Sequence, residues 1–229
     1  MSQAREPGKR EQNKADKQRR IRAAARQLFS SRGYSSVTTQ EVADTAEVGT
    51  GTLFRYAQSK AELLCMVANE DLRAMVETVP DTGDPVEDLV RLCEPLIIAL
   101  DNQPENIAAY HRETLFGEPG PHRSAAQTIL QDVREIIAVI LARHGGQNRG
   151  QKGHSREGDE DPGRFTGPAQ TVFDVMYMTI VRSGVERTPG RDSRGELREQ
   201  VGHVLNGALP SMRSSPAAGP TPGAVTLPR

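Results

Sequence analysis

The chain contains no tryptophan, and aromatic residues make up only 4% of its 229 residues. No apolar run approaches the roughly 18 residues that a membrane-spanning helix needs, so we expect no membrane segment. The N-terminal run MSQAREPGKREQNKADKQRR has no apolar stretch, which argues against a secretory signal peptide. We therefore expect a cytoplasmic protein.

The residue patterns of known catalytic and metal sites are also missing. Only two cysteines occur, Cys65 and Cys93, and without a C-x-x-C pair we interpret them as buried free thiols. Phosphate-binding, dinucleotide-binding, zinc-protease and hydrolase motifs are absent. His111 and Glu113 form an H-x-E pair, but the P-C-x-x-C of zinc deaminases is lacking, so both are interpreted as ordinary polar residues of a helix, with a place on a ligand cavity as the alternative. We expect no catalytic residue, no metal site and no cofactor, and hence no enzyme.

Charge is divided unevenly along the chain. Residues 1–60 hold 12 Lys and Arg against 6 Asp and Glu. Out of 29 and 30 in the whole chain, the remaining residues therefore hold 17 against 24. A basic segment on an acidic body indicates that the N-terminal region binds a polyanion.

The segment from Thr38 to Lys60 predicts two short helices on a tight turn. Thr38 and Glu41 form a capping box, which predicts a helix over residues 39–46. Glu47-Val48-Gly49 follows as the turn, and a second short helix with small polar residues at its start is expected over 50–56. Such a pair is typical of the DNA-reading helix-turn-helix.

The run from residue 21 to residue 64, roughly a fifth of the chain, resembles the N-terminal domain of the TetR (tetracycline-repressor-like) family of transcriptional regulators. The resemblance implies an all-α protein, with a three-helix DNA-binding bundle followed by a helical ligand-binding and dimerisation domain. The matching residues are Ile21, Ala24, Ala25, Leu28, Phe29, Gly33, Tyr34, Thr38, Thr39, Val42, Ala43, Ala46, Val48, Gly51, Thr52, Leu53, Tyr56, Ser59, Lys60 and Leu63.

Composition and periodicity divide the chain into four parts. We predict a disordered basic tail over 1–14, a helix-turn-helix domain over 15–58, a helical regulatory and dimerisation domain over 59–210 with a mobile loop at 147–167, and a disordered tail over 211–229.

Apolar periodicity predicts the helices themselves. They are expected over 15–31, over 59–78, from Asp84-Pro85 to about Leu100 with a kink at Pro95, over 104–116, up to about Arg143 with a stop at Gly145-Gly146, over 168–187 and over 193–209.

The helix expected over 168–187 is apolar on all sides, which indicates burial on two sides. We attribute the second side to a twin subunit, although burial in the core of one chain would also explain it. The predicted interface of the homodimer is formed by Val175, Ile180, Val201 and Leu205.

The second motif helix is expected in the major groove of double-stranded DNA. Base contacts are predicted for Gln40, Thr50, Gly51 and Thr52, and phosphate contacts for Thr39, Tyr56 and Lys60. Simple helix capping is the alternative role for Thr39, and packing under the motif is the alternative for Tyr56.

We expect a repressor that binds a palindromic operator as a homodimer and is released by a small-molecule inducer. The expected inducer pocket includes Leu96, Tyr110, Thr114 and Met176, for which a plain core role is the alternative. A different hypothesis is a helical DNA-binding regulator that is controlled by a protein partner docking on loop 147–167 or on the C-terminal tail.

Overall fold

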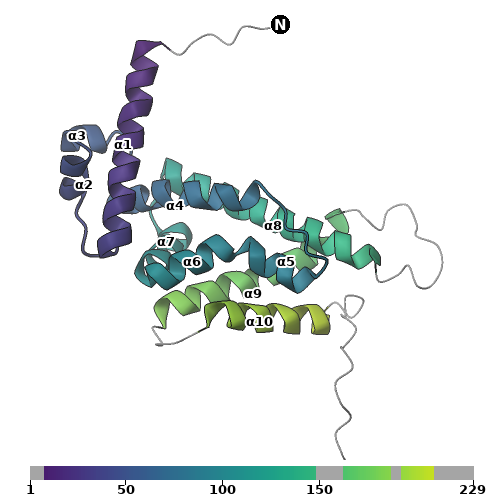
Figure 1. Cartoon of the computed structure of the whole chain (residues 1–229). Coiled ribbons are helices and arrows are strands. Elements are labelled where there is room, and N and C mark those ends of the chain that lie inside the picture. The colour runs from purple at the N-terminus through teal and green to yellow at the C-terminus, as the bar shows by residue number, and fades with distance from the viewer. Residues whose placement is uncertain (1–7, 148–161, 187–191, 209–229) are drawn as a thin grey trace, which may run out of the picture.

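The computed structural model describes residues 8–147, 162–186 and 192–208, and every secondary-structure element in these ranges is a helix (Figure 1). None of the helices in the described part of the chain combines the length and apolarity needed to cross a bilayer. The elements are α1 (Lys9–Arg32), α2 (Thr39–Thr45), α3 (Thr50–Leu53), α4 (Lys60–Val76), α5 (Pro85–Leu92), α6 (Glu94–Asn102), α7 (Pro104–Phe116), α8 (Pro121–Gln147), the 3-10 helix η1 (Pro162–Phe165), α9 (Thr166–Val185) and α10 (Ser193–Ala208).

The first three helices form a head that projects from the body of the molecule (Figure 1). Phe29 of α1, Val42 of α2 and Leu53 of α3 are buried together in one apolar core. Leu63 and Leu64 at the start of α4 join the same core, so α4 connects the head to the body. This apolar packing fixes the short helices α2 and α3, which are too short to be stable alone.

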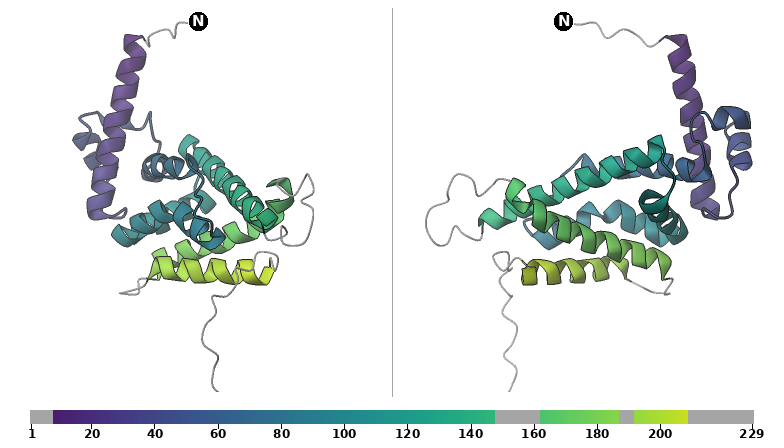
Figure 2. Two further views of the ribbon diagram at one scale, coloured as in Figure 1. Left: turned by 45° about the vertical axis from the view of Figure 1, so that its right-hand side comes forward. Right: turned by 180° about the vertical axis from the view of Figure 1, so that it is seen from behind.

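The body is built on a second core. Leu89 of α5, Ile137 of α8, Val172 of α9 and Leu197 of α10 are buried in this cluster. Helix α4 packs along α8, and α8 packs on α9. Helices α9 and α10 lie side by side and form the outer layer of the body (Figure 2).

The break expected at Pro95 is present. Helix α5 ends at Leu92 and α6 begins at Glu94, so the apolar run is divided at Cys93. Proline has no N–H to donate, and its ring clashes with the carbonyl group four residues earlier. The chain therefore ends one helix here and continues as a second helix.

Three of the predicted helix ends are wrong. Helix α3, expected over 50–56, ends at Leu53. Helix α1 begins at Lys9, so residues 9–14 are helical, and the Gly8 amide donates to the carboxylate of Glu11 over 3.3 Å. Helix α8 continues through Gly145 and Gly146 to Gln147. A glycine in a helix costs only about 1 kcal/mol, which the packing of a 27-residue helix offsets.

The end of the predicted loop 147–167 is also helical, because η1 covers residues 162–165 and α9 begins at Thr166. The rest of that loop, residues 148–161, lies outside the described residues, as do residues 1–7 and the tail from residue 209. Most of loop 147–167 and the C-terminal tail, on which the hypothesis of a protein partner depends, therefore lies outside the described residues.

Candidate nucleic-acid interface and regulatory cavity

The start of α2 is held by the predicted capping box. The Thr38 hydroxyl accepts from the Glu41 amide over 3.2 Å, and the Glu41 carboxylate accepts from the Thr38 amide over 2.8 Å. The same carboxylate pairs with Arg32 at the end of α1 over 2.7 Å. The hydrogen bond from Arg32, followed by those from Thr38, lowers the pKa of Glu41 to about 2. The charged capping box thus ties α2 to α1.

The turn between α2 and α3 has a left-handed residue at Glu47, with φ of 52°. This conformation favours glycine, and a residue with a Cβ pays a conformational penalty there. The next residue closes the turn, because the Val48 amide donates to the Ala43 carbonyl over 3.0 Å. The Glu47 side chain stays exposed at the tip, with one carboxylate oxygen 3.6 Å from Arg20.

Two of the predicted base-contact residues are already joined in the free protein. The Thr50 hydroxyl donates to the amide oxygen of Gln40 over 2.9 Å, and the Gln40 amide nitrogen donates to Asp44 over 2.8 Å. Because both ends of the Gln40 amide have a partner, its orientation is set before DNA arrives. The start of α3 and the first turn of α2 therefore form one surface.

The exposed side of α3 is small and partly apolar. A Cβ built on Gly51 would have no neighbour within 4 Å, so folding does not require a glycine there. A base edge or phosphate that approaches the backbone closely would still favour a residue without a Cβ at position 51, but such a contact forms only in a complex with DNA. Thr52 is half-buried, and the ring of Phe54 is 41% exposed beside it. No DNA contact is predicted for Phe54 from the sequence, because its apolar ring lacks the hydroxyl that a phosphate contact would use.

The predicted phosphate-contact residues lie at the edges of the head. Thr39 is half-buried in the first turn of α2, and the Tyr56 hydroxyl donates to the Lys14 carbonyl over 3.2 Å. The Lys60 ammonium donates to the Ser35 carbonyl over 3.2 Å and lies 4.4 Å above the ring of Tyr34. Tyr56 and Lys60 therefore have partners within the head, and a phosphate would have to share or replace them.

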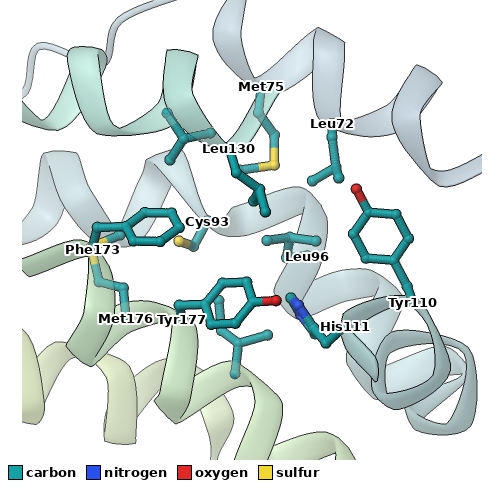
Figure 3. Close-up of a pocket in the computed structure, with 12 residues that line it drawn as sticks. Leu72, Met75, Cys93, Leu96, Tyr110, His111, Leu130, Phe173, Met176 and Tyr177 are labelled. Carbon is teal, nitrogen blue, oxygen red and sulfur yellow. The ribbon is translucent and has the colours of Figure 1, made fainter. Parts of the chain in front are cut away.

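Inside the body, α4, α6, α7, α8 and α9 surround a small apolar cavity of about 30 Å³ (Figure 3). Of the residues predicted for an inducer pocket, Leu96, Tyr110 and Met176 line this cavity, whereas Thr114 does not. The Thr114 hydroxyl instead donates to the Tyr110 carbonyl one turn earlier, over 2.8 Å. The lining residues are Leu72, Met75, Cys93, Leu96, Tyr110, His111, Leu130, Val133, Phe173, Met176, Tyr177 and Ile180.

Two polar side chains meet in this cavity. The rings of His111 and Tyr177 are in edge contact with their centroids 4.5 Å apart, and in Figure 3 the Tyr177 hydroxyl is directed toward the His111 ring. Neither ring nitrogen of His111 nor the Tyr177 hydroxyl has a hydrogen-bond partner among the described residues. Burial lowers the pKa of His111 to about 4 and raises that of Tyr177 to about 12, so both are uncharged near neutral pH. Of the two roles left open for His111, an ordinary helix position or a place on a cavity, its ring has the second, because it lines the cavity.

A larger groove of about 700 Å³ lies on the other side of part of this wall. Leu72, Leu96 and Tyr110 line both spaces. The groove extends to α1, where Arg26 and Phe29 line it, so it spans the junction of head and body.

Three of the four predicted interface residues lie inside a single chain. Ile180, Val201 and Leu205 are at most 4% exposed, and all three are in the core of the body. Their assignment to a surface between subunits was wrong, because α9 and α10 bury these side chains between themselves and their neighbours. Only Val175 retains partial exposure.

Comparison with known proteins supports this description. Residues 21–65 match the model of the bacterial regulatory proteins of the tetR family. FadR of Thermus thermophilus, a TetR-family transcriptional repressor in complex with lauroyl-CoA, is 26% identical, with a TM-score of 0.60 over 89% of this chain and 100% of that chain. No curated protein matches the chain by sequence.

Two more distant structures share the fold. A TetR transcriptional regulator from Rhodococcus sp. RHA1 is 19% identical, with a TM-score of 0.59 over 84% of this chain and 97% of that chain. The fatty acid degradation regulator FadR from Bacillus halodurans is 16% identical, with a TM-score of 0.55 over 82% of this chain and 97% of that chain.

The capped α2, the tight turn and the exposed α3 on a helical body define a helix-turn-helix DNA-binding protein. The family match covers this head and the start of α4. Residues 21–65 therefore form a tetR-family DNA-binding domain, and the chain as a whole has the fold of TetR-family transcriptional regulators.

Proposed function

We propose that this regulator is a homodimeric repressor that binds a palindromic operator and is released when a small molecule occupies the cavity of the body. One observation carries the ligand-responsive part of the proposal. A chain of hydrogen bonds connects the cavity wall to the end of the DNA-reading segment.

This series of hydrogen bonds begins at Tyr110, whose ring lines the cavity. The Tyr110 hydroxyl donates to the side-chain oxygen of Asn69 over 3.1 Å, and the Asn69 amide nitrogen donates to the His122 carbonyl over 2.8 Å. The His122 ring nitrogen Nε2 in turn lies 2.9 Å from the carbonyl oxygen of Tyr56, just after α3. Asn69 is 1% exposed, so water does not compete for its bonds.

The start of α8 is fixed to α4 as well. The carboxylate of Glu62 accepts from the backbone amides of His122 and Arg123, over 3.1 Å and 3.0 Å. A carboxylate at a helix N-terminus is stabilising, so a shift of α4 should carry the start of α8 with it. A ligand that displaces Tyr110 would therefore shift His122 and, through it, the position of α3.

Dimerisation is supported by the outer face of α9. Val175, Met178, Val181 and Val185 follow one another at spacings of three, three and four residues, so they share a face of the helix. Met178 is 56% and Val185 is 67% exposed, while the other two are half-buried. An exposed apolar stripe on an outer helix fits a second copy of the chain, with α10 beside it.

Symmetric dimers place two heads on half-sites roughly 34 Å apart, one turn of DNA. A shift of either head by a few ångströms then misplaces it relative to its half-site. The lauroyl-CoA complex of the Thermus thermophilus relative supports a ligand with an apolar part, since the cavity of this chain is lined mainly by apolar side chains.

The proposal is tested by selecting bound sequences from a random DNA pool and measuring affinity by fluorescence anisotropy. We expect a palindromic consensus, and loss of binding with at least one mainly apolar compound from a panel of long-chain alcohols, acids and acyl-CoA esters. Featureless or asymmetric selected DNA would contradict the symmetric-dimer part. DNA affinity that no compound of the panel changes, but that a protein partner changes, would favour the partner-controlled regulator.

A substitution of Asn69 tests the series of hydrogen bonds from Tyr110 to Tyr56. Asn69→Ala removes both side-chain hydrogen bonds, so the inducing compound should still bind while releasing DNA less effectively. Gln127→Ala removes an exposed amide on α8 and serves as the control. If Asn69→Ala responded to the compound as the unaltered protein does, the chain would not carry the signal.

A further inference from the structure

The side chains that line the cavity indicate the chemical class of its ligand. We propose that it binds an uncharged, mainly apolar molecule whose buried end has one hydroxyl group, and that this hydroxyl bonds to His111 and Tyr177. The inference rests on the proposed function of the cavity as the ligand site.

His111 and Tyr177 have hydrogen-bonding groups that a ligand can satisfy. His111 is 2% exposed, yet neither ring nitrogen has a partner among the described residues, and the Tyr177 hydroxyl is in the same state. Buried polar groups without partners are rare and costly. A neutral imidazole offers one donor and one acceptor, and a phenol can do either. A hydroxyl, which both donates and accepts, complements this pair.

The charges around the cavity limit the ligand to an uncharged group. No Lys, Arg, Asp or Glu is among the residues that line the cavity. The guanidinium of Arg134 lies 4.5 Å from the centroid of the Phe173 ring, which therefore stands between it and part of the cavity. Because burial lowers the pKa of His111 to about 4, the imidazole supplies no positive charge near neutral pH. The charge of Arg134 acts on Tyr177, but Arg134 is not among the lining residues, so a carboxylate, phosphate or ammonium would have no direct counter-ion in the cavity. Such burial is unfavourable.

The volumes of the cavity and of the neighbouring groove limit the size of the ligand. A cavity of about 30 Å³ holds only the polar end of a ligand and a few further atoms. Leu72, Leu96 and Tyr110 line both this cavity and the groove of about 700 Å³, so an elongated ligand whose polar end lies in the cavity would reach the groove by displacing these side chains. The groove is lined there by Val67 and Ile107 as well, which suits an aliphatic tail.

The test uses isothermal titration calorimetry of the full chain without DNA, at about pH 7.5, where His111 is neutral. The probes are octan-1-ol, octanoate and octylammonium, which share one aliphatic chain and differ at the end group. We expect octan-1-ol to bind at least about tenfold more tightly than either ion.

Variants then locate the hydroxyl. Tyr177→Phe and His111→Phe should each weaken octan-1-ol binding by roughly three- to tenfold, the effect of one hydrogen bond. Tyr34→Phe removes a hydroxyl from the head and should leave binding unchanged. In the unaltered protein, a His111 ring resonance assigned by its loss in His111→Phe should shift when octan-1-ol binds.

Octanoate or octylammonium binding as tightly as octan-1-ol would overturn the inference, as would an absence of octan-1-ol binding or wild-type affinity in Tyr177→Phe. The comparison of end groups uses the unaltered protein, so it holds even if a variant misfolds. Octan-1-ol that binds as expected but leaves DNA bound would count against the proposed function alone. Release of DNA by other compounds, with no octan-1-ol binding, would count against this inference alone.

Discussion

Burial of an uncharged imidazole makes the stability of the body depend on pH in a way that one substitution removes. His111 is 2% exposed, and its pKa falls from the ordinary 6.5 to about 4 in the folded chain. The unfolded chain therefore takes up a proton at His111 before the folded chain does. The free energy of unfolding should decrease as the pH falls from 6.5 toward 4, and this contribution should level off below that range.

The size of the effect follows from the two pKa values. The difference of about 2.5 units, at 1.36 kcal/mol per unit, corresponds to about 3 kcal/mol once His111 is protonated in both the unfolded and the folded state. Such a loss is a large fraction of the stability of a typical domain. His111→Phe keeps an aromatic ring against Tyr177 but cannot be protonated, so it should lack this loss.

Urea unfolding of both proteins between about pH 7.5 and about pH 4.5 measures the effect. The buried pair His144–Asp88 and the exposed carboxylates are present in both proteins, so their contributions cancel in the difference. The stability of the unaltered protein relative to the variant should fall by about 2–3 kcal/mol across this range. A difference that stays constant with pH would refute the assignment of His111 as a buried neutral group.

Four further substitutions test the head and the outer face of α9. Glu47→Gly should stabilise the protein by about 0.5–1 kcal/mol in urea unfolding, because it relieves the left-handed φ of 52°. Thr52→Ala should change the preferred base at one operator position and cost about 1–3 kcal/mol on the best site, as sequence selection and anisotropy would show. Lys60→Ala should weaken all DNA sequences alike and flatten the log–log salt dependence by about one unit, and an unchanged slope would exclude this phosphate contact. Met178→Glu should give a folded monomer in sedimentation, and a variant that stays dimeric would place the interface elsewhere.

The head could be predicted from the sequence because its signals are local. Thr38 and Glu41 are three residues apart, and their capping box forms whatever the rest of the chain does. The tight turn at Glu47 depends on the backbone of neighbouring residues, and α7 began and ended where its flanking Pro104 and Gly117 indicated. Such short-range patterns, together with the spacing of apolar residues, determined the fold class.

What only the tertiary structure decided is which face of each helix meets which neighbour. Apolar periodicity does not distinguish Ile180, buried in the core, from Met178, which is 56% exposed two residues earlier on the same all-round apolar helix. In the same way, His111 faces the cavity while Thr114 bonds back to its own helix. These outcomes depend on the packing of α4, α6, α8 and α9, which are far apart in sequence, and no local pattern specifies the angles at which those helices meet.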